Sequence, residues 1–267
     1  MKIRAIALQT FGSLLRNRLI LLFVLGFACM LLLMLTPLLT VKSMASNWST
    51  SQTQGMVLTL VSGAMSFMSG FGSLLAAWSA ADAVSTEMRS GTILAVMARP
   101  VRRWEFLLGK YLGVQLLMVV YVAAIFLTGY LLAWIGGQGI QSAPWVLLVY
   151  PLVRYAIYSA LAIFFVTVFH PIVSFGLVLL TSVAASIFAH SNSLPAFVPD
   201  WLRAGIYSVL PSTELLSETR FLTLTRASLT SEPWGHHLIA LTYGLDYALV
   251  CFLLAVWAFR KRSLSRL

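Results

Sequence analysis

Six long apolar stretches, separated by short polar segments, constrain this chain more than any other feature of its sequence. They cover residues 19–41, 56–81, 106–135, 144–169, 171–190 and 238–259. About 20 apolar residues in a helix cross the ~30 Å hydrocarbon core of a bilayer with every backbone hydrogen bond satisfied internally. Only 10% of the 267 residues are charged, whereas soluble domains carry roughly a quarter. The sequence therefore predicts an all-α integral membrane protein, with six transmembrane helices in a single domain over residues 1–267.

Residues 1–18 precede the first predicted span and differ from it in pattern. Apolar residues recur there at helical spacing, and the positions between them are basic or polar. This pattern predicts an amphipathic helix that lies in the membrane interface. A disordered basic leader would explain the charges but not the spacing. The adjoining apolar run is long and lacks a small-residue cleavage site, so we expect the segment to be retained and not removed as a signal peptide.

The segment 82–105 is the longest charged interruption between apolar stretches in the first two-thirds of the chain, and we expect a hairpin there. Its interior combines an apolar helical face with arginines, and it is too short to have a core of its own. The apolar residues are Ile93, Leu94, Val96 and Met97, and the arginines beside them are Arg99, Arg102 and Arg103. Such a surface is typical of a docking site for a partner protein. The alternative is an ordinary basic loop on the cytoplasmic side of a membrane.

A motif spans this hairpin and the start of the next apolar stretch. It consists of Glu87, Gly91-Thr92, Pro100, Arg103 and Leu108-Gly109-Lys110. This E…GT…P…R…LGK pattern resembles the signature of ABC-2 type transporter permeases. Within that family the chain most resembles the branch that contains the permease of the nitrous oxide reductase maturation transporter.

The resemblance implies a permease subunit, and an exporter, that dimerises and couples ATP hydrolysis by separate ATPase subunits to substrate movement. ATP and Mg would then be bound by the ATPase partner, and this chain would need no cofactor. The resemblance and the residue pattern together predict an ATPase docking site at Glu87, Gly91, Thr92, Ile93, Leu94, Val96, Met97, Arg99, Pro100, Arg102 and Arg103. The alternative function is a non-transporting membrane anchor or sensor that binds its partner through the same hairpin.

The distribution of positive charge predicts the orientation of the chain. Thirteen of the 18 Lys and Arg residues fall in the amino-terminal segment, the hairpin and the carboxyl tail. Basic loops stay in the cytoplasm, so both termini and the hairpin are expected there. The resemblance implies a multi-pass protein of the bacterial plasma (inner) membrane. The segment 191–237 would then lie at the outer face, with short helices at about 201–209 and 213–224. It would either cap a transport path or shield the bundle.

Two charged residues fall inside predicted spans. Arg154 lies ten residues after Pro144, about 15 Å deep by helix rise, and Asp246 lies eight residues after Leu238, about 12 Å deep. An isolated charge at that depth costs roughly 2.5–3.5 kcal/mol, and pairing would relieve both. We therefore predict an Arg154–Asp246 contact, direct or through water, whose role could be structural or substrate-binding. Small residues in the second span indicate close helix packing or the lining of a substrate path.

Several other classes of function find no support in the sequence. No phosphate-binding loop surrounds Gly109-Lys110, because Tyr111 follows and no glycine stands five residues earlier. No catalytic residues are predicted, and neither the cysteines nor the histidines have the spacing of a metal site. The basic residues cluster at span ends, so no nucleic acid is expected as a partner. Expected partners are the ATPase subunit, a second copy of this chain and membrane lipid. An accessory or periplasmic protein and the identity of the substrate remain open.

Overall fold

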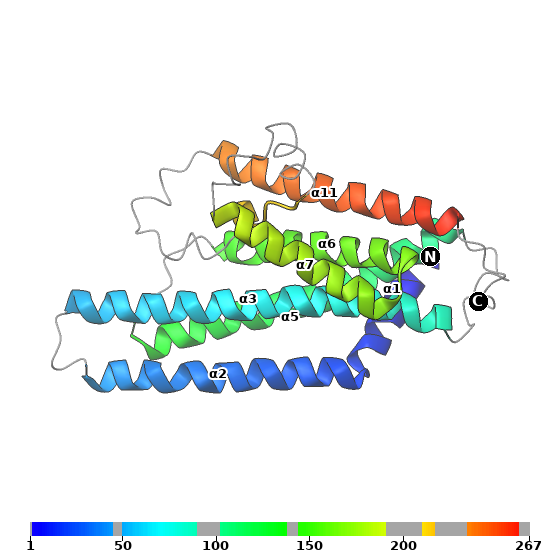
Figure 1. The fold of residues 1–267 in the computed structure, drawn as a ribbon. Helices are drawn as coiled ribbons and strands as arrows, with labels where there is room; N and C mark the ends of the chain where they lie inside the picture. The colour runs from blue at the N-terminus through cyan, green and yellow to red at the C-terminus, as the bar shows by residue number, and fades with distance from the viewer. Residues whose placement is uncertain are drawn as a thin grey trace.

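The structure is a computed structural model that describes residues 2–44, 50–89, 102–137, 144–190, 210–216 and 234–261. The secondary structure assigned over these ranges is helical, as the sequence predicts. The elements are α1 (Lys2–Leu15), α2 (Arg18–Met44), α3 (Thr50–Arg89), α5 (Arg103–Ile135), α6 (Pro144–Val168), α7 (Pro171–His190), the 3₁₀ turn η2 (Thr213–Leu216) and α11 (Trp234–Lys261). Figure 1 shows the long helices lying side by side, with α1 at one end of the bundle.

Five of the described helices are long and apolar enough to cross a membrane. They are α2, α3, α5, α6 and α11. Helix α7 is apolar but shorter, with an apolar stretch at Pro171–Ser186. The chain is thus a helical, multi-pass membrane protein, and the sixth crossing stays a prediction.

Helix α6 occupies the centre of the bundle. It packs against α3, α5, α7 and α11, and most of its apolar stretch is buried by them. Its Tyr155 side chain is fully buried and lies against Gly72 of α3, where a Cβ atom would clash with the tyrosine ring. Tyr155 also donates a hydrogen bond to the backbone oxygen of Ser69 at 3.1 Å. One small residue of the second predicted span, Gly72, therefore permits a close contact between two helices.

Helix α2 lies at the opposite extreme of burial. Almost none of its apolar stretch is buried within the chain, although it has the highest mean hydropathy of the candidate spans. It packs chiefly against α3. An apolar helix of this length with so little protein cover requires lipid or another apolar surface on its outer side.

Helix α3 departs from the predicted boundaries at both ends. It begins at Thr50, inside the predicted polar loop, and it continues to Arg89, eight residues beyond the expected end of the span. The extension is stabilised by apolar burial, because Val84 and Met88 lie on the buried face that Ala77 and Ala80 begin. Residues 82–89, which the sequence assigned to the hairpin, are therefore helical, and the cytoplasmic position of the hairpin stays a prediction.

The segment predicted at the outer face is described only in part. Residues 201–209 and 217–224, where helices were predicted, lie outside the described residues. Thr213–Leu216 forms a single 3₁₀ turn, and Leu216 is fully buried beside Gly244 of α11. The backbone N–H of Ser212 donates to the Tyr243 hydroxyl at 2.9 Å. This turn is therefore fixed to α11.

Candidate functional site

A buried ion pair joins the last turn of α3 to the second turn of α5. The Lys110 ammonium donates to Oε1 of Glu87, and the two side chains keep only 5% and 21% of their surface exposed. The ammonium also lies over the Phe106 ring, 5.7 Å from its centroid. Burying one charge alone would be costly, so each charge stabilises the buried position of the other. The two helices that flank residues 90–101 are thereby fixed to each other.

Arg103, at the start of α5, binds the end of α11. Its Nη1 donates to the backbone oxygens of Phe259 at 3.2 Å and Arg260 at 3.0 Å. The last carbonyls of a helix have no partner within the helix, and they carry its negative dipole end, so a guanidinium stabilises them. The Phe106 and Phe259 rings stack beside this contact with centroids 6.2 Å apart. Arg103 therefore positions the end of α11 against the start of α5.

Glu105 stabilises the first turn of α5. Its Oε2 accepts a hydrogen bond from the backbone N–H of Arg102 at 2.9 Å. An acidic side chain three residues into a helix satisfies a backbone donor and favours the positive dipole end. The helix therefore begins where the charged segment ends, with Arg103 inside it.

Two glycines of α5 allow α1 to lie directly on it. A Cβ atom at Gly109 would come within 2.7 Å of the Ile6 side chain, and one at Gly113 within 2.6 Å of the Thr10 side chain. Glycines four residues apart share a helix face, so together they form a groove for α1. Helix α1, the end of α3, the start of α5 and the end of α11 meet at one end of the bundle. We call this region the hairpin end.

Asp82 connects α3 to the turn between α1 and α2. Its Oδ2 accepts a hydrogen bond from the Asn17 amide at 2.7 Å, and its Oδ1 accepts one from the Thr86 hydroxyl at 3.2 Å. The structure places Asp82 at the hairpin end and adds Asn17, which the docking prediction did not include.

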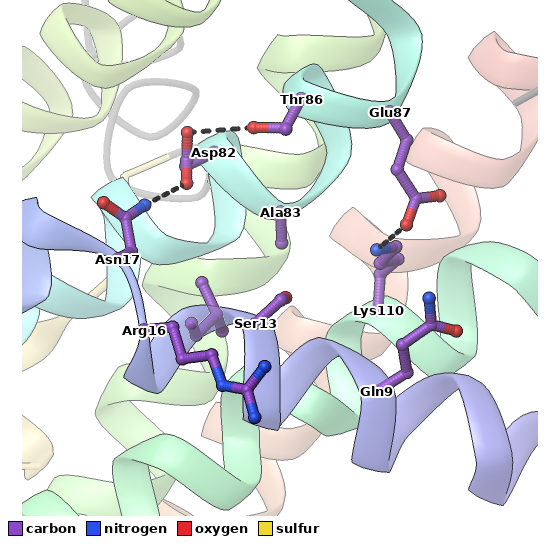
Figure 2. A pocket seen from close by; sticks show the side chains of 10 residues that line it. Gln9, Ser13, Arg16, Asn17, Asp82, Ala83, Thr86, Glu87 and Lys110 are labelled. Atoms are coloured by element: carbon purple, nitrogen blue, oxygen red, sulfur yellow. Dashed lines mark hydrogen bonds and ion pairs between the residues drawn. The ribbon is translucent and has the colours of Figure 1, made fainter. Parts of the chain in front are cut away.

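A cavity of about 330 Å³ lies between α1, α3 and α5 at the hairpin end (Figure 2). Polar side chains of α1 and α3 line it, and the Glu87–Lys110 pair forms part of its lining. The residues are Gln9, Ser13, Leu14, Arg16, Asn17, Asp82, Ala83, Thr86, Glu87 and Lys110. Volumes of about 300 Å³ and more are typical of small-molecule sites.

The predicted docking residues are described only at the edges of the site. Glu87 forms the ion pair with Lys110, Arg103 binds α11, and Arg102 is exposed immediately before α5. Residues Gly91, Thr92, Ile93, Leu94, Val96, Met97, Arg99 and Pro100 lie outside the described residues. Docking through this segment stays a prediction.

The two intramembrane charges lie on different helices, α6 and α11. Arg154 of α6 donates through Nη2 to the Ser69 hydroxyl of α3, and its guanidinium lies 5.7 Å from the Tyr155 ring centroid. Asp246 lies on an exposed position of α11. The Arg154–Asp246 contact stays a prediction, and Ser69 is a partner of Arg154 that sequence reasoning did not identify.

Sequence reasoning also missed a polar contact near the other end of the bundle. The Tyr150 hydroxyl of α6 and Nδ1 of His237 in α11 lie 2.6 Å apart, beside the stacked rings of Trp145 and Trp234. The sequence signal for this contact is a tryptophan near the start of each of the two helices, α6 and α11, because tryptophans are enriched at membrane interfaces. In the described ranges no group of three or more His, Cys, Asp or Glu side chains could hold a metal ion.

Comparison with known proteins agrees with the motif and the fold. The family model described as ABC-2 family transporter protein matches residues 4–264. The curated proteins gave no match to this chain. Members of that family are membrane components that generally work with a separate ATP-binding subunit. The match covers nearly the whole chain, including the Glu87–Lys110 pair, Arg103 and the two glycines of α5 on which α1 lies. This protein therefore belongs to the ABC-2 family of transporter proteins.

Proposed function

We propose that this chain is the permease subunit of an ATP-binding-cassette exporter that acts as a homodimer in the bacterial inner membrane. Each copy would recruit a separate ATPase subunit, which binds ATP and Mg²⁺, on its cytoplasmic side. The observation that carries the proposal is the buried Glu87–Lys110 pair in a chain of the ABC-2 family. It fixes together the two helices between which the proposed docking segment lies.

The contacts at the hairpin end support a role in transmitting force. The Glu87–Lys110 pair links α3 to α5, Arg103 links α5 to α11, and α1 lies in the groove of α5. A displacement of residues 90–101 would therefore move the ends of four helices together. ATPase subunits that bind one arrangement of these ends more tightly would shift the bundle toward it, by as much as the difference in binding free energy.

Six membrane crossings are the arrangement that the contacts favour. Arg103 places the end of α11 at the hairpin end, where α3 also ends and α5 begins. Helix α6 returns toward that end, because the Gln115 amide in the first half of α5 donates to the Ser159 hydroxyl in the second half of α6 at 2.6 Å. The chain must then cross back before α11 begins. Helix α7, with 20 residues and about 30 Å of length, fits that crossing.

Docking of the ATPase is tested by charge placed on the apolar face of the hairpin. The double variant Leu94→Asp/Met97→Asp is expected to abolish co-purification of the ATPase subunit, because a carboxylate buried in an apolar interface costs several kcal/mol. The matched control is Leu94→Ile/Met97→Leu, which keeps an apolar face of similar volume and is expected to retain the subunit. Membrane insertion is checked for both variants by fractionation. Retained co-purification of the aspartate variant would contradict docking at this face.

Transport is separated from an anchoring role by measuring ATP turnover. We expect the ATPase subunit to hydrolyse ATP faster in reconstituted complexes with this chain than alone, and candidate substrates to change that rate. A rate independent of this chain, with no substrate accumulating in vesicles, would favour the anchor or sensor function. Breaking the ion pair by Lys110→Met should lower substrate movement per ATP hydrolysed, because the contact that holds the last turn of α3 to α5 would be lost.

A further inference from the structure

We propose that the cavity between α1, α3 and α5 binds the phosphoethanolamine headgroup of a zwitterionic phospholipid. The cavity is open between side chains of opposite hydrogen-bonding character. Gln9 and Ser13 of α1 line the cavity together with Arg16, which directly follows α1, and Figure 2 shows these on one side with Asp82 and Glu87 of α3 on the other. The Arg16 guanidinium and the Gln9 amide supply donors, whereas the Ser13 hydroxyl already donates to the backbone oxygen of Thr10. The α3 residues supply carboxylate acceptors. This separation matches a headgroup with a phosphate at one end and an ammonium at the other.

The faces of α1 place the cavity at the depth of lipid headgroups. Leu8 and Leu15, seven residues apart and on one face, are 53% and 49% exposed. Ala7, Thr10 and Leu14 form the face buried against the bundle, and the cavity residues form a third face between the two. An apolar face beside a polar one is the arrangement of a helix in the membrane interface.

The start of α2 gives a second, independent measure of that depth. Its apolar span begins at Ile20, three residues after Asn17, which lines the cavity. The hydrocarbon layer therefore begins within one helical turn of the cavity. A phospholipid whose acyl chains lie along α2 would bring its headgroup to this level.

The charges in the lining select a zwitterion over an anion or a cation. The lining holds the cations Arg16 and Lys110 and the anions Asp82 and Glu87, so its formal charge is balanced. An anionic headgroup would approach the carboxylates without compensation, and a cation alone would meet Arg16. The Asp82 oxygens each accept one hydrogen bond at 2.7 and 3.2 Å and have further lone pairs. A primary ammonium can donate to them, whereas a choline group has no N–H to donate.

The experiment measures lipid binding to the full-length chain by native mass spectrometry in a delipidating detergent. Phosphatidylethanolamine, phosphatidylcholine and phosphatidylglycerol with identical acyl chains are titrated in parallel. We expect phosphatidylethanolamine to bind about tenfold more tightly than the other two, the effect of one charge-assisted hydrogen bond. Water-soluble glycerophosphoethanolamine should compete with it, because the cavity recognises the headgroup; a failure to compete would assign the binding to the acyl chains and overturn the proposal.

Three variants assign the binding to this cavity. Arg16→Ala should weaken phosphatidylethanolamine binding about tenfold, and Asp82→Asn should remove the preference over phosphatidylcholine. Arg4→Ala is the matched control, because Arg4 is an exposed arginine of α1 outside the cavity lining, and its binding should equal that of the wild type. Arg16 is itself exposed, so its replacement removes no packed side chain, and thermal unfolding checks that Asp82→Asn remains folded.

Three further results would overturn the proposal. The first is equal affinity for the three lipids, and the second is equal losses for Arg4→Ala and Arg16→Ala, which would indicate nonspecific attraction of α1 to lipid. The third is displacement of phosphatidylethanolamine by the ATPase subunit in the assembled complex, which would assign the cavity to a loop of that protein. The binding test uses this chain alone in its other arms, so its outcome is independent of whether the complex transports.

Discussion

The Glu87–Lys110 pair is the residue-scale feature whose removal should be most informative. Lys110→Met keeps an unbranched side chain beside Phe106 but leaves Glu87 without its cationic partner. We expect this variant to lose about 2–3 kcal/mol of unfolding free energy, somewhat below the cost of breaking a fully buried pair, because Glu87 keeps some exposure to water. The measurement is denaturation of the purified chain in mixed micelles.

The double variant Glu87→Met/Lys110→Met serves as the control for that loss. Replacement of a buried ion pair by apolar residues of similar volume is often neutral or stabilising, so this variant should recover most of the lost stability. Reduced coupling of transport in the double variant, despite restored stability, would show that the pair also acts in the mechanism. A loss in the double variant equal to the sum of the losses in Glu87→Met and Lys110→Met would contradict an interaction between the two side chains.

Sequence reasoning identified Glu87 and Lys110 as motif residues but did not pair them. Twenty-three residues separate them, and the intervening segment was assigned to a hairpin that included Glu87 itself. The pairing depends on α3 continuing to Arg89, which apolar burial of Val84 and Met88 decides.

Matching depths likewise suggested a contact for Arg154, but depth along a helix axis does not determine which neighbouring helix a side chain faces. Its contact with Ser69 required knowledge of how α6 is rotated.

The groove of α5 makes a prediction at the scale of whole elements. Gly109→Ala and Gly113→Ala should each destabilise the chain by about 1–3 kcal/mol, since the added methyl group overlaps Ile6 or Thr10 of α1. Displaced α1 should also become more sensitive to trypsin at Arg4. Thermal unfolding and limited proteolysis measure the two effects.

Two glycines of α3 provide the control for this test. Gly63 and Gly70 have no heavy atom within 4 Å of an added Cβ. Alanine at those positions should be neutral or stabilise the helix by up to about 1 kcal/mol, because alanine has the higher helix propensity. If all four substitutions behave alike, the changes report helix propensity, and the fit between α1 and α5 is contradicted.

The bounds of a helix could be predicted from the sequence where the helix coincides with an apolar stretch. The stretches at 106–135 and 144–169 correspond closely to α5 and α6, because glycine and proline interrupt the apolar pattern between them. The ends of α2 and α3 were not predictable in this way. Lys42 was assigned to a polar loop, yet α2 continues to Met44. A polar residue can end a membrane span without ending the helix, because a span is defined by its contact with lipid and a helix by its backbone hydrogen bonds.

At the scale of the whole molecule, the proposed mechanism requires that the hairpin end face the cytoplasm and that α7 cross the membrane. Single cysteines test both requirements in a background where Cys29 and Cys251 are replaced by alanine. Lys2→Cys, His170→Cys and Lys261→Cys should react with a membrane-impermeant maleimide only from the cytoplasmic side. His236→Cys should react only from the opposite side. All four native side chains are exposed, so poor access to the reagent does not account for the expected pattern.

The pair His170 and His236 isolates the crossing of α7, because they lie before and after the segment in which it would occur. Labelling of both from one side would mean that α7 stays within one leaflet, and α11 would then have to end on the side away from Arg103. The contact of Arg103 with Arg260 argues against that, since it holds the ends of α11 and the beginning of α5 together. Labelling of Lys2 from outside would have a different meaning. It would place the Glu87–Lys110 pair, the contact of Arg103 with α11 and the docking segment where no cytoplasmic ATPase can bind, and the permease mechanism would be excluded.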